Sequence, residues 1–380
     1  MFRIVAIALV ALAFATPAAA QNRAERTLTQ LLAEHERIER QFDPITSGQW
    51  NDDAALSRLP DFSPAGVEAR RAALASLRPR VAAVDERQLS EAAALNRTLL
   101  LRTIDDNLES ISFDRARLGG GGGSFDGLGR TTTLRSRADA EAWLTRMALM
   151  PAAMQQSIEN QRRGIATGWT QPRQIIERAI TVARATAERS AEQSPLLAPF
   201  DTLPSNVTQA DRDALRARGL AIVREQIKPL QQAQLRFLET ELLPAARPGL
   251  GARTLPNGDA YYSYLVRSFT TTNMTPEEVH ALGQSEVRRI RALMDAAIAE
   301  SGFRGSFAEF IRFLRTDPQF YARTPEELER YVALLTRRSD AGLPRLFGRL
   351  PQLTYDIRRT PEEIASTAPT AGYDLGSMNL

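Results

Sequence analysis

Apolar residues recur at intervals of three and four along most of this chain, and no region shows sustained alternation of apolar and polar residues. One such stripe runs through residues 23–42, at Leu28, Leu31, Leu32, His35, Ile38 and Phe42. A second includes Trp143, Leu144, Met147, Met154 and Ile158. Spacing of three and four residues places side chains on one face of an α-helix, whereas a half-buried strand needs alternation. The pattern therefore predicts an all-α, multi-helix protein with few or no strands.

Helix starts are marked by a repeated capping sequence. Thr-Pro-Glu-Glu occurs at Thr275–Glu278, Thr324–Glu327 and Thr360–Glu363. A threonine N-cap, a proline at the first helical position and a glutamate at the third are typical of a helix N-terminus. The unequal spacing of the three copies indicates repeated capping chemistry rather than a repeat architecture. Thr208 and Asp211 resemble a further cap, and they open a helix predicted over residues 208–246.

Prolines and glycines divide the remaining helices. We expect helices over residues 65–84 and 87–110, and a helix pair over 136–150 and 151–163. Pro229 should kink the helix of residues 208–246. Five consecutive glycines, Gly119–Gly123, lack the lysine and the strand-to-helix context of a phosphate-binding loop. Residues 119–129 are therefore predicted to form a flexible surface loop.

The first 20 residues have the features of a secretory signal peptide. Arg3 precedes an apolar run from Ile4 to Ala15, and Ala18–Ala20 supply small residues at a cleavage site. We expect cleavage after Ala20, a periplasmic or secreted protein, and one helical domain from residue 21 to 380. The chain has no cysteine, which excludes disulfides, thiolate metal ligands and a lipid-modified cysteine within it. No other apolar run approaches the length of a membrane span, so we expect no membrane anchor.

The charge balance argues against nucleic acid as a partner. The chain has 48 basic and 45 acidic residues, for a formal net charge of +3. Almost all of the basic residues are arginines, since Lys228 is the only lysine. No basic run is long enough to form a phosphate-binding surface.

The segment Leu255–Gly283 concentrates aromatic, hydroxyl and turn-forming residues. Pro256–Asp259 predicts a turn, and Tyr261, Tyr262 and Arg267 follow it. An arginine fork and amphipathic tyrosines can bind a polar or carboxylate-bearing ligand. Alternatively, the tyrosines wedge between neighbouring helices and the threonines form a turn into the next helix. The pattern alone leaves both interpretations open.

Several short motifs occur in an order that resembles a known bacterial family. They are GIATGWTQP at Gly164–Pro172, Pro256–Gly258 with Tyr261, Thr270–Thr272, TPEEVHALG at Thr275–Gly283, GFRGS at Gly302–Ser306, LRTDP at Leu314–Pro318 followed by Phe320 and Tyr321, and LPRLFGRLP at Leu343–Pro351. In this order they resemble the family known as domain of unknown function 885 over nearly the whole mature chain.

The resemblance implies a helical zinc peptidase, often exported, whose HExxH-type motif follows the position that matches residues 369–380. Two histidines one helical turn apart can share zinc, and the intervening glutamate can act as a general base. This chain has only His35 and His280, in no such spacing. We therefore expect no metal or catalytic residue within it, although complete family members should hold zinc. The expectation is that it forms the N-terminal part of such an enzyme and is C-terminally incomplete.

Two functions follow from these patterns. In the first, the chain is the N-terminal portion of an exported zinc-dependent peptidase-like hydrolase that is not catalytic alone. Tyr261, Tyr262, Arg267, Thr271 and His280 would then border a cleft for a peptide substrate. In the second, it is a shortened, non-catalytic periplasmic protein that binds peptides or a partner. A Ser-His-Asp hydrolase is disfavoured, because the sequence contains no G-x-S-x-G elbow.

Overall fold

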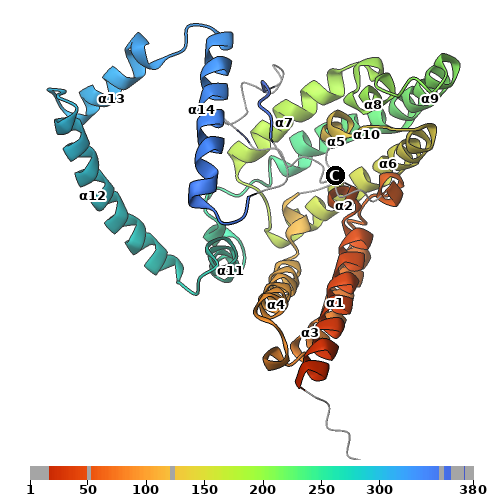
Figure 1. Ribbon diagram of the computed structural model, residues 1–380. Coiled ribbons are helices and arrows are strands. Elements are labelled where there is room, and N and C mark those ends of the chain that lie inside the picture. Colours follow the sequence, from red (N-terminus) through yellow and green to blue (C-terminus); the bar gives the residue numbers. More distant parts are fainter. Residues whose placement is uncertain (1–16, 49–52, 120–124, 351–354, 361–371, 373–380) are drawn as a thin grey trace, which may run out of the picture. The chain divides into compact units, whose positions relative to one another are not determined.

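The computed structural model describes residues 17–48, 53–119, 125–350, 355–360 and 372 (Figure 1). These residues form helices joined by short turns, and the only β-type pairing among them is an isolated parallel bridge between Pro172 and Arg247. The all-α expectation is confirmed. The chain divides into two compact units, one up to Thr272 and one from Asn273. The expectation of a single domain over residues 21–380 stays a prediction.

The first unit begins with three helices around an apolar core. They are α1 (Pro17–Phe42), α3 (Pro64–Ala82) and α4 (Glu91–Ser112). Leu31, Leu74, Leu77 and Ile104 pack between them, and the last three are almost completely buried. The stripe predicted in residues 23–42 is thus the buried face of α1. The short helices α2 (Pro44–Gly48), η1 (Asp53–Ser57) and η2 (Glu86–Gln88) connect these elements.

The segment after α4 contains more helix than the sequence indicated. η3 (Arg115–Leu118) precedes α5 (Asp126–Thr131), so residues 126–129 of the predicted loop are helical. Gly129 of α5 packs so closely on the backbone of Pro195 that an added Cβ would lie 2.2 Å from its carbonyl oxygen. This tertiary contact holds a turn of helix that the local glycine content disfavours. The glycines at positions 120–123, which belong to the predicted loop, lie outside the described residues.

α6 (Arg137–Thr167) is one continuous helix, whereas the sequence predicted a pair divided at Pro151. Pro151 lies inside it, although proline removes a backbone hydrogen bond and crowds the preceding turn. Met147, Met150 and Met154 are all buried on both sides of the proline. Their burial stabilises the helix on both sides of Pro151. The prediction of two helices was wrong because it considered the proline alone.

The next helices follow α6 in the chain. They are α7 (Arg173–Glu188), η4 (Ala191–Gln193), η5 (Pro195–Leu197), α8 (Ala198–Asp201) and α9 (Gln209–Ile222), followed by α10 (Lys228–Phe237). Among them, α9 and α10 pack against α6. Two π-helical segments flank α10, namely η6 (Val223–Ile227) and η7 (Leu238–Leu242). A π-turn widens the backbone directly before Pro229, where the proline ring would crowd an α-helical carbonyl. The backbone is therefore irregular beside Pro229, while the kink expected there stays a prediction.

The first unit ends with η8 (Ala252–Thr254) and α11 (Gly258–Thr270). The second unit contains α12 (Pro276–Glu300), α13 (Phe307–Thr316), η9 (Pro318–Phe320) and α14 (Pro325–Leu346). Thr275 and Glu278 form the predicted capping box at the start of α12, and Thr324 caps α14. The third copy of this motif, at Thr360–Glu363, lies mostly outside the described residues.

None of the helices in the described ranges is both long and apolar enough to cross a membrane. Most of the proposed signal peptide, residues 1–16, and the C-terminal residues 373–380 lie outside those ranges.

Candidate functional site

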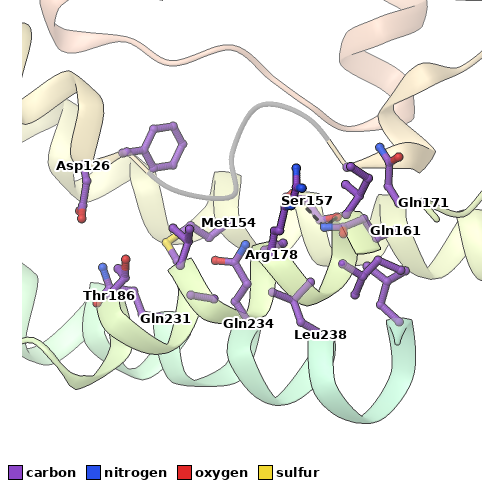
Figure 2. Close-up of a pocket in the computed structure, with 18 of the residues that line it drawn as sticks. Asp126, Met154, Ser157, Gln161, Gln171, Arg178, Thr186, Gln231, Gln234 and Leu238 are labelled. Carbon is purple, nitrogen blue, oxygen red and sulfur yellow. Dashed lines mark hydrogen bonds between the residues drawn. The ribbon is translucent and has the colours of Figure 1, made fainter. Parts of the chain in front are cut away.

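A cavity of the first unit lies between α6, α7 and α10 (Figure 2). It has a volume of about 520 Å³, within the range of about 300–1,000 Å³ that is typical of small-ligand sites. α10 packs against both α6 and α7, so side chains from the three helices face the same space. η3 and the start of α5 contribute Leu118, Gly119, Phe125 and Asp126.

The walls of the cavity are mostly apolar. α6 contributes Met150 and Met154, and α7 contributes Ile175, Ala179 and Val182. The α7 residues recur at intervals of three and four and so form one face of the helix. Ile175 and Val182 are 45% and 62% exposed, which is unusual for aliphatic side chains on a packed helix. From Ile175 to Thr186 this wall is about 16 Å long at 1.5 Å per helical residue.

Uncharged hydrogen-bonding groups interrupt the apolar walls. Gln161 is 6% exposed and its amide nitrogen donates to the carbonyl oxygen of Ser157 at 3.2 Å. Gln171 donates to the carbonyl oxygen of Leu118 at 3.1 Å. Gln231 and Gln234, one turn apart on α10, also line the space. Side-chain amides can both donate and accept, so this lining matches a ligand that carries amide groups.

Gln231 has an unsatisfied polar atom beside the cavity. Its side-chain oxygen is buried and has no hydrogen-bond partner. An unsatisfied buried acceptor costs about 1–3 kcal/mol. Rotation of the side-chain amide toward the cavity would let a ligand N–H group satisfy it.

Two charged side chains near the cavity, Asp126 and Lys228, are held by partners from other elements. Asp126 is buried, and Arg189 forms an ion pair with it at 2.6 Å. Lys228 donates to the carbonyl oxygens of Thr186, Ala187 and Arg189 at 3.2, 2.6 and 2.5 Å. Burial lowers the pKa of Lys228, an effect that the nearby arginine reinforces and Asp126 opposes. These contacts tie the C-terminal end of α7 to α10.

Tyr261, which the sequence predicted as a ligand contact, lies in an aromatic cluster. Tyr261 is 5% exposed and its ring centroid is 5.1 Å from that of Phe113 and 5.3 Å from that of Trp169. Tyr264 lies 5.4 Å from Phe113. Tyr261 and Tyr264 are thus wedged between helices, as one of the two sequence interpretations describes. The cluster adjoins the cavity through Leu118, which packs against it.

The other predicted residues of α11 have partners of their own. Tyr262 is 39% exposed, with the guanidinium of Arg253 centred 5.6 Å from its ring. Arg267 forms an ion pair with Glu109. Thr271 follows α11 in a left-handed conformation, with φ of 58°. These three residues are close in sequence to Tyr261, but none of the four lines the cavity.

His280 lies in the second unit, on α12. Its ring nitrogen is 2.9 Å from the side-chain nitrogen of Gln284. His280 therefore belongs to a different compact unit from the four other predicted residues. Its predicted contact with substrate, like theirs, stays a prediction.

The sequence patterns did not identify the cavity residues as a candidate site. The methionines of α6 were interpreted as core, which describes their burial but not the space beside them. An available signal was the second apolar stripe of α7, with Ile175 and Val182 beside the buried Ile176 and Ile180. A helix with two apolar faces covers more than one neighbour or lines a cavity.

The family resemblance implies zinc, and a zinc site needs several ligand side chains close together. Within the described ranges, no three His, Asp or Glu side chains lie close enough together to hold a metal ion. The cavity lining in these ranges contains no histidine. The side chains in the described ranges therefore do not fit a zinc site.

Comparison with known proteins supports the fold. A model of the family described as "Bacterial protein of unknown function (DUF885)" matches residues 44–379. A solved structure titled "The crystal structure of the putative lipoprotein from Colwellia psychrerythraea" is similar, with a TM-score of 0.75 and 17% sequence identity. The similarity covers 93% of this chain but 64% of that one, so the chain spans less than two thirds of its neighbour. No curated protein matches the sequence.

Proposed function

The chain belongs to the bacterial DUF885 family, and on that premise we propose that it forms the peptide-binding helical part of an exported, zinc-dependent peptidase-like hydrolase. By itself it binds peptides without cleaving them. The observation that carries this proposal is the cavity between α6, α7 and α10, which side-chain amides line together with aliphatic residues.

The dimensions of the cavity support a short extended peptide as the ligand. A wall of about 16 Å accommodates about five residues at roughly 3.3 Å per extended residue. The apolar faces of α6 and α7 suit aliphatic side chains, while Gln161, Gln231 and Gln234 suit backbone amides. A plain hydrocarbon chain would leave these amides without partners, at a cost.

The remaining parts of the proposal rest on the resemblance and on the leader. Residues 1–20, with cleavage after Ala20, support export, and the neighbour's title is compatible with it. The family resemblance supports zinc-dependent hydrolysis by the complete protein. The spacing of His35 and His280 supports the absence of hydrolysis by this chain alone.

The second candidate is a non-catalytic periplasmic protein that binds peptides or a partner. The lack of histidine among the described lining residues favours it. The two functions share the cavity as a binding site and differ in whether a complete protein hydrolyses what binds there.

Peptide binding and cleavage by the purified chain test the proposal. Binding of pentapeptides rich in Ala and Leu is measured by calorimetry, and cleavage by mass spectrometry with and without added Zn²⁺. We expect saturable binding and intact peptide in both cases. Ala179→Trp fills the cavity from α7 and should weaken binding at least about tenfold, or about 1.4 kcal/mol.

The matched control is Ala185→Trp, since Ala185 is also an exposed alanine of α7 but does not line the cavity. It should bind as the unmodified chain does. Absence of peptide binding, or equal loss in both tryptophan variants, would refute the cavity as the binding site. Zinc-dependent cleavage by this chain would refute the claim that it is not catalytic alone.

A further inference from the structure

We infer that Arg178 makes the cavity selective for peptides with a free C-terminal carboxylate. This inference rests on the proposed function. It specifies which peptides bind and in which direction a bound peptide runs along the cavity. Arg178 belongs to α7 and lines the cavity, where Figure 2 draws its side chain with those of Met154 and Gln161.

Arg178 differs from the other arginines near α7 in its lack of a carboxylate partner. Arg173 pairs with Glu177 at 3.7 Å, and Arg184 with Glu239 at 2.6 Å. Arg189 pairs with Asp126 at 2.6 Å. No carboxylate within the described ranges forms an ion pair with Arg178. An arginine without a partner on a cavity wall is available to an acidic ligand.

No acidic side chain of the cavity competes for this position. The carboxylate in the lining is Asp126, and Arg189 already neutralises it. The ammonium of Lys228 is held by three carbonyl oxygens near the same end of α7. Arg189, which lies outside the lining, compensates Asp126, so the positive charge of Arg178 has no compensating carboxylate among the lining residues. A guanidinium binds a carboxylate through two parallel N–H···O bonds, which gives geometric selectivity as well as affinity.

The position of Arg178 on α7 sets the direction of the peptide. From Arg178 to Thr186 the wall extends about 12 Å, enough for about four extended residues. The terminal carboxylate would lie at Arg178, and the preceding residues would run toward Thr186 and Gln231. Since Arg189 neutralises Asp126, no free charge awaits the peptide's amino end. N-terminal acetylation should therefore leave affinity unchanged.

Calorimetric titration of the full chain with four ligands tests this inference. The ligands are the acetylated tetrapeptide Ala-Leu-Ala-Leu as the free acid, the same peptide as the C-terminal amide, the unacetylated acid, and dodecanoate. We expect the acid to bind about tenfold more tightly than the amide, and the preference to shrink at high salt. Dodecanoate supplies the carboxylate without peptide amides and should bind more weakly than the acid.

Two matched variants assign the preference to one residue. Arg178→Gln should bind the acid and the amide equally, at the affinity that the unmodified chain shows for the amide. Arg173→Gln removes an exposed arginine from the same helix outside the cavity and should keep the tenfold preference. Circular dichroism checks that both variants keep their helix content.

The outcomes separate this inference from the proposed function. If no peptide binds, the proposed function fails and the inference with it. If acid and amide bind the unmodified chain equally, the cavity still binds peptides but Arg178 is not selective. If Arg178→Gln keeps the preference, another group reads the carboxylate. If dodecanoate binds as tightly as the peptide acid, the cavity selects an acyl chain and the inference about peptides is overturned.

Discussion

Replacing Lys228 with methionine should destabilise the first unit by about 3 kcal/mol. The ammonium donates to three carbonyl oxygens at the end of α7, at 2.5 to 3.2 Å. A hydrogen bond from a charged donor contributes about 1.5–3 kcal/mol net. The three hydrogen bonds share one ammonium, and the cost of desolvating that ammonium opposes them. Their net contribution to stability therefore stays near the upper value for one such bond. Methionine keeps the apolar stem but leaves the carbonyls without this donor.

Urea unfolding followed by tryptophan fluorescence measures this change. Trp143 and Trp169 are both buried in the first unit, so their emission reports on that unit. With a slope of about 3 kcal/mol/M, the transition midpoint should fall by about 1 M. The control is Arg71→Met, which removes an exposed ion pair with Glu68 that water screens, and it should leave the transition midpoint nearly unchanged. A Lys228→Met effect no larger than that of the control would refute this account of how α7 is held.

Two further predictions concern packing and pH. Gly164→Ala should destabilise by about 2 kcal/mol, although alanine is the better helix former, because its Cβ would lie 2.3 Å from the carbonyl oxygen of Arg117. Gly127→Ala meets nothing within 4 Å and should be neutral or stabilising in the same urea assay, so equal losses would contradict the packing argument. Burial lowers the pKa of His35, an effect that Glu39 partly offsets. The stability linked to neutral His35 is therefore present above its ordinary pKa and lost as pH falls through the lowered value. The free energy of unfolding should drop more between pH 7.5 and 5 in the unmodified chain than in His35→Gln, and parallel pH profiles would count against it.

Helix starts could be predicted from the sequence because their determinants are local. The Thr275 capping box lies within four residues, and the cap at Thr208 accepts a hydrogen bond from the Asp211 backbone as expected. Continuity through Pro151 could not be predicted in this way. It depends on the burial of Met147 and Met154 by helices from elsewhere in the chain.

The candidate site was less accessible to sequence reasoning. The role of Tyr261 depends on Phe113 and Trp169, which come from two distant segments. The availability of Arg178 is also a tertiary property, since the pairing of Arg184 with Glu239 joins residues far apart in sequence. The sequence alone does not show which arginine lacks a carboxylate partner in the folded chain.

Photochemical crosslinking tests the central claim, that peptides bind between α6, α7 and α10, most directly. The probe is the acetylated tetrapeptide acid with benzoylphenylalanine in place of its second residue, and the adduct is mapped by mass spectrometry. The account predicts adducts on α6 or α7, at residues such as Met154 and Val182, and their loss when unlabelled acid is added in excess. Adducts confined to residues outside the cavity, or adducts that excess acid does not displace, would contradict it.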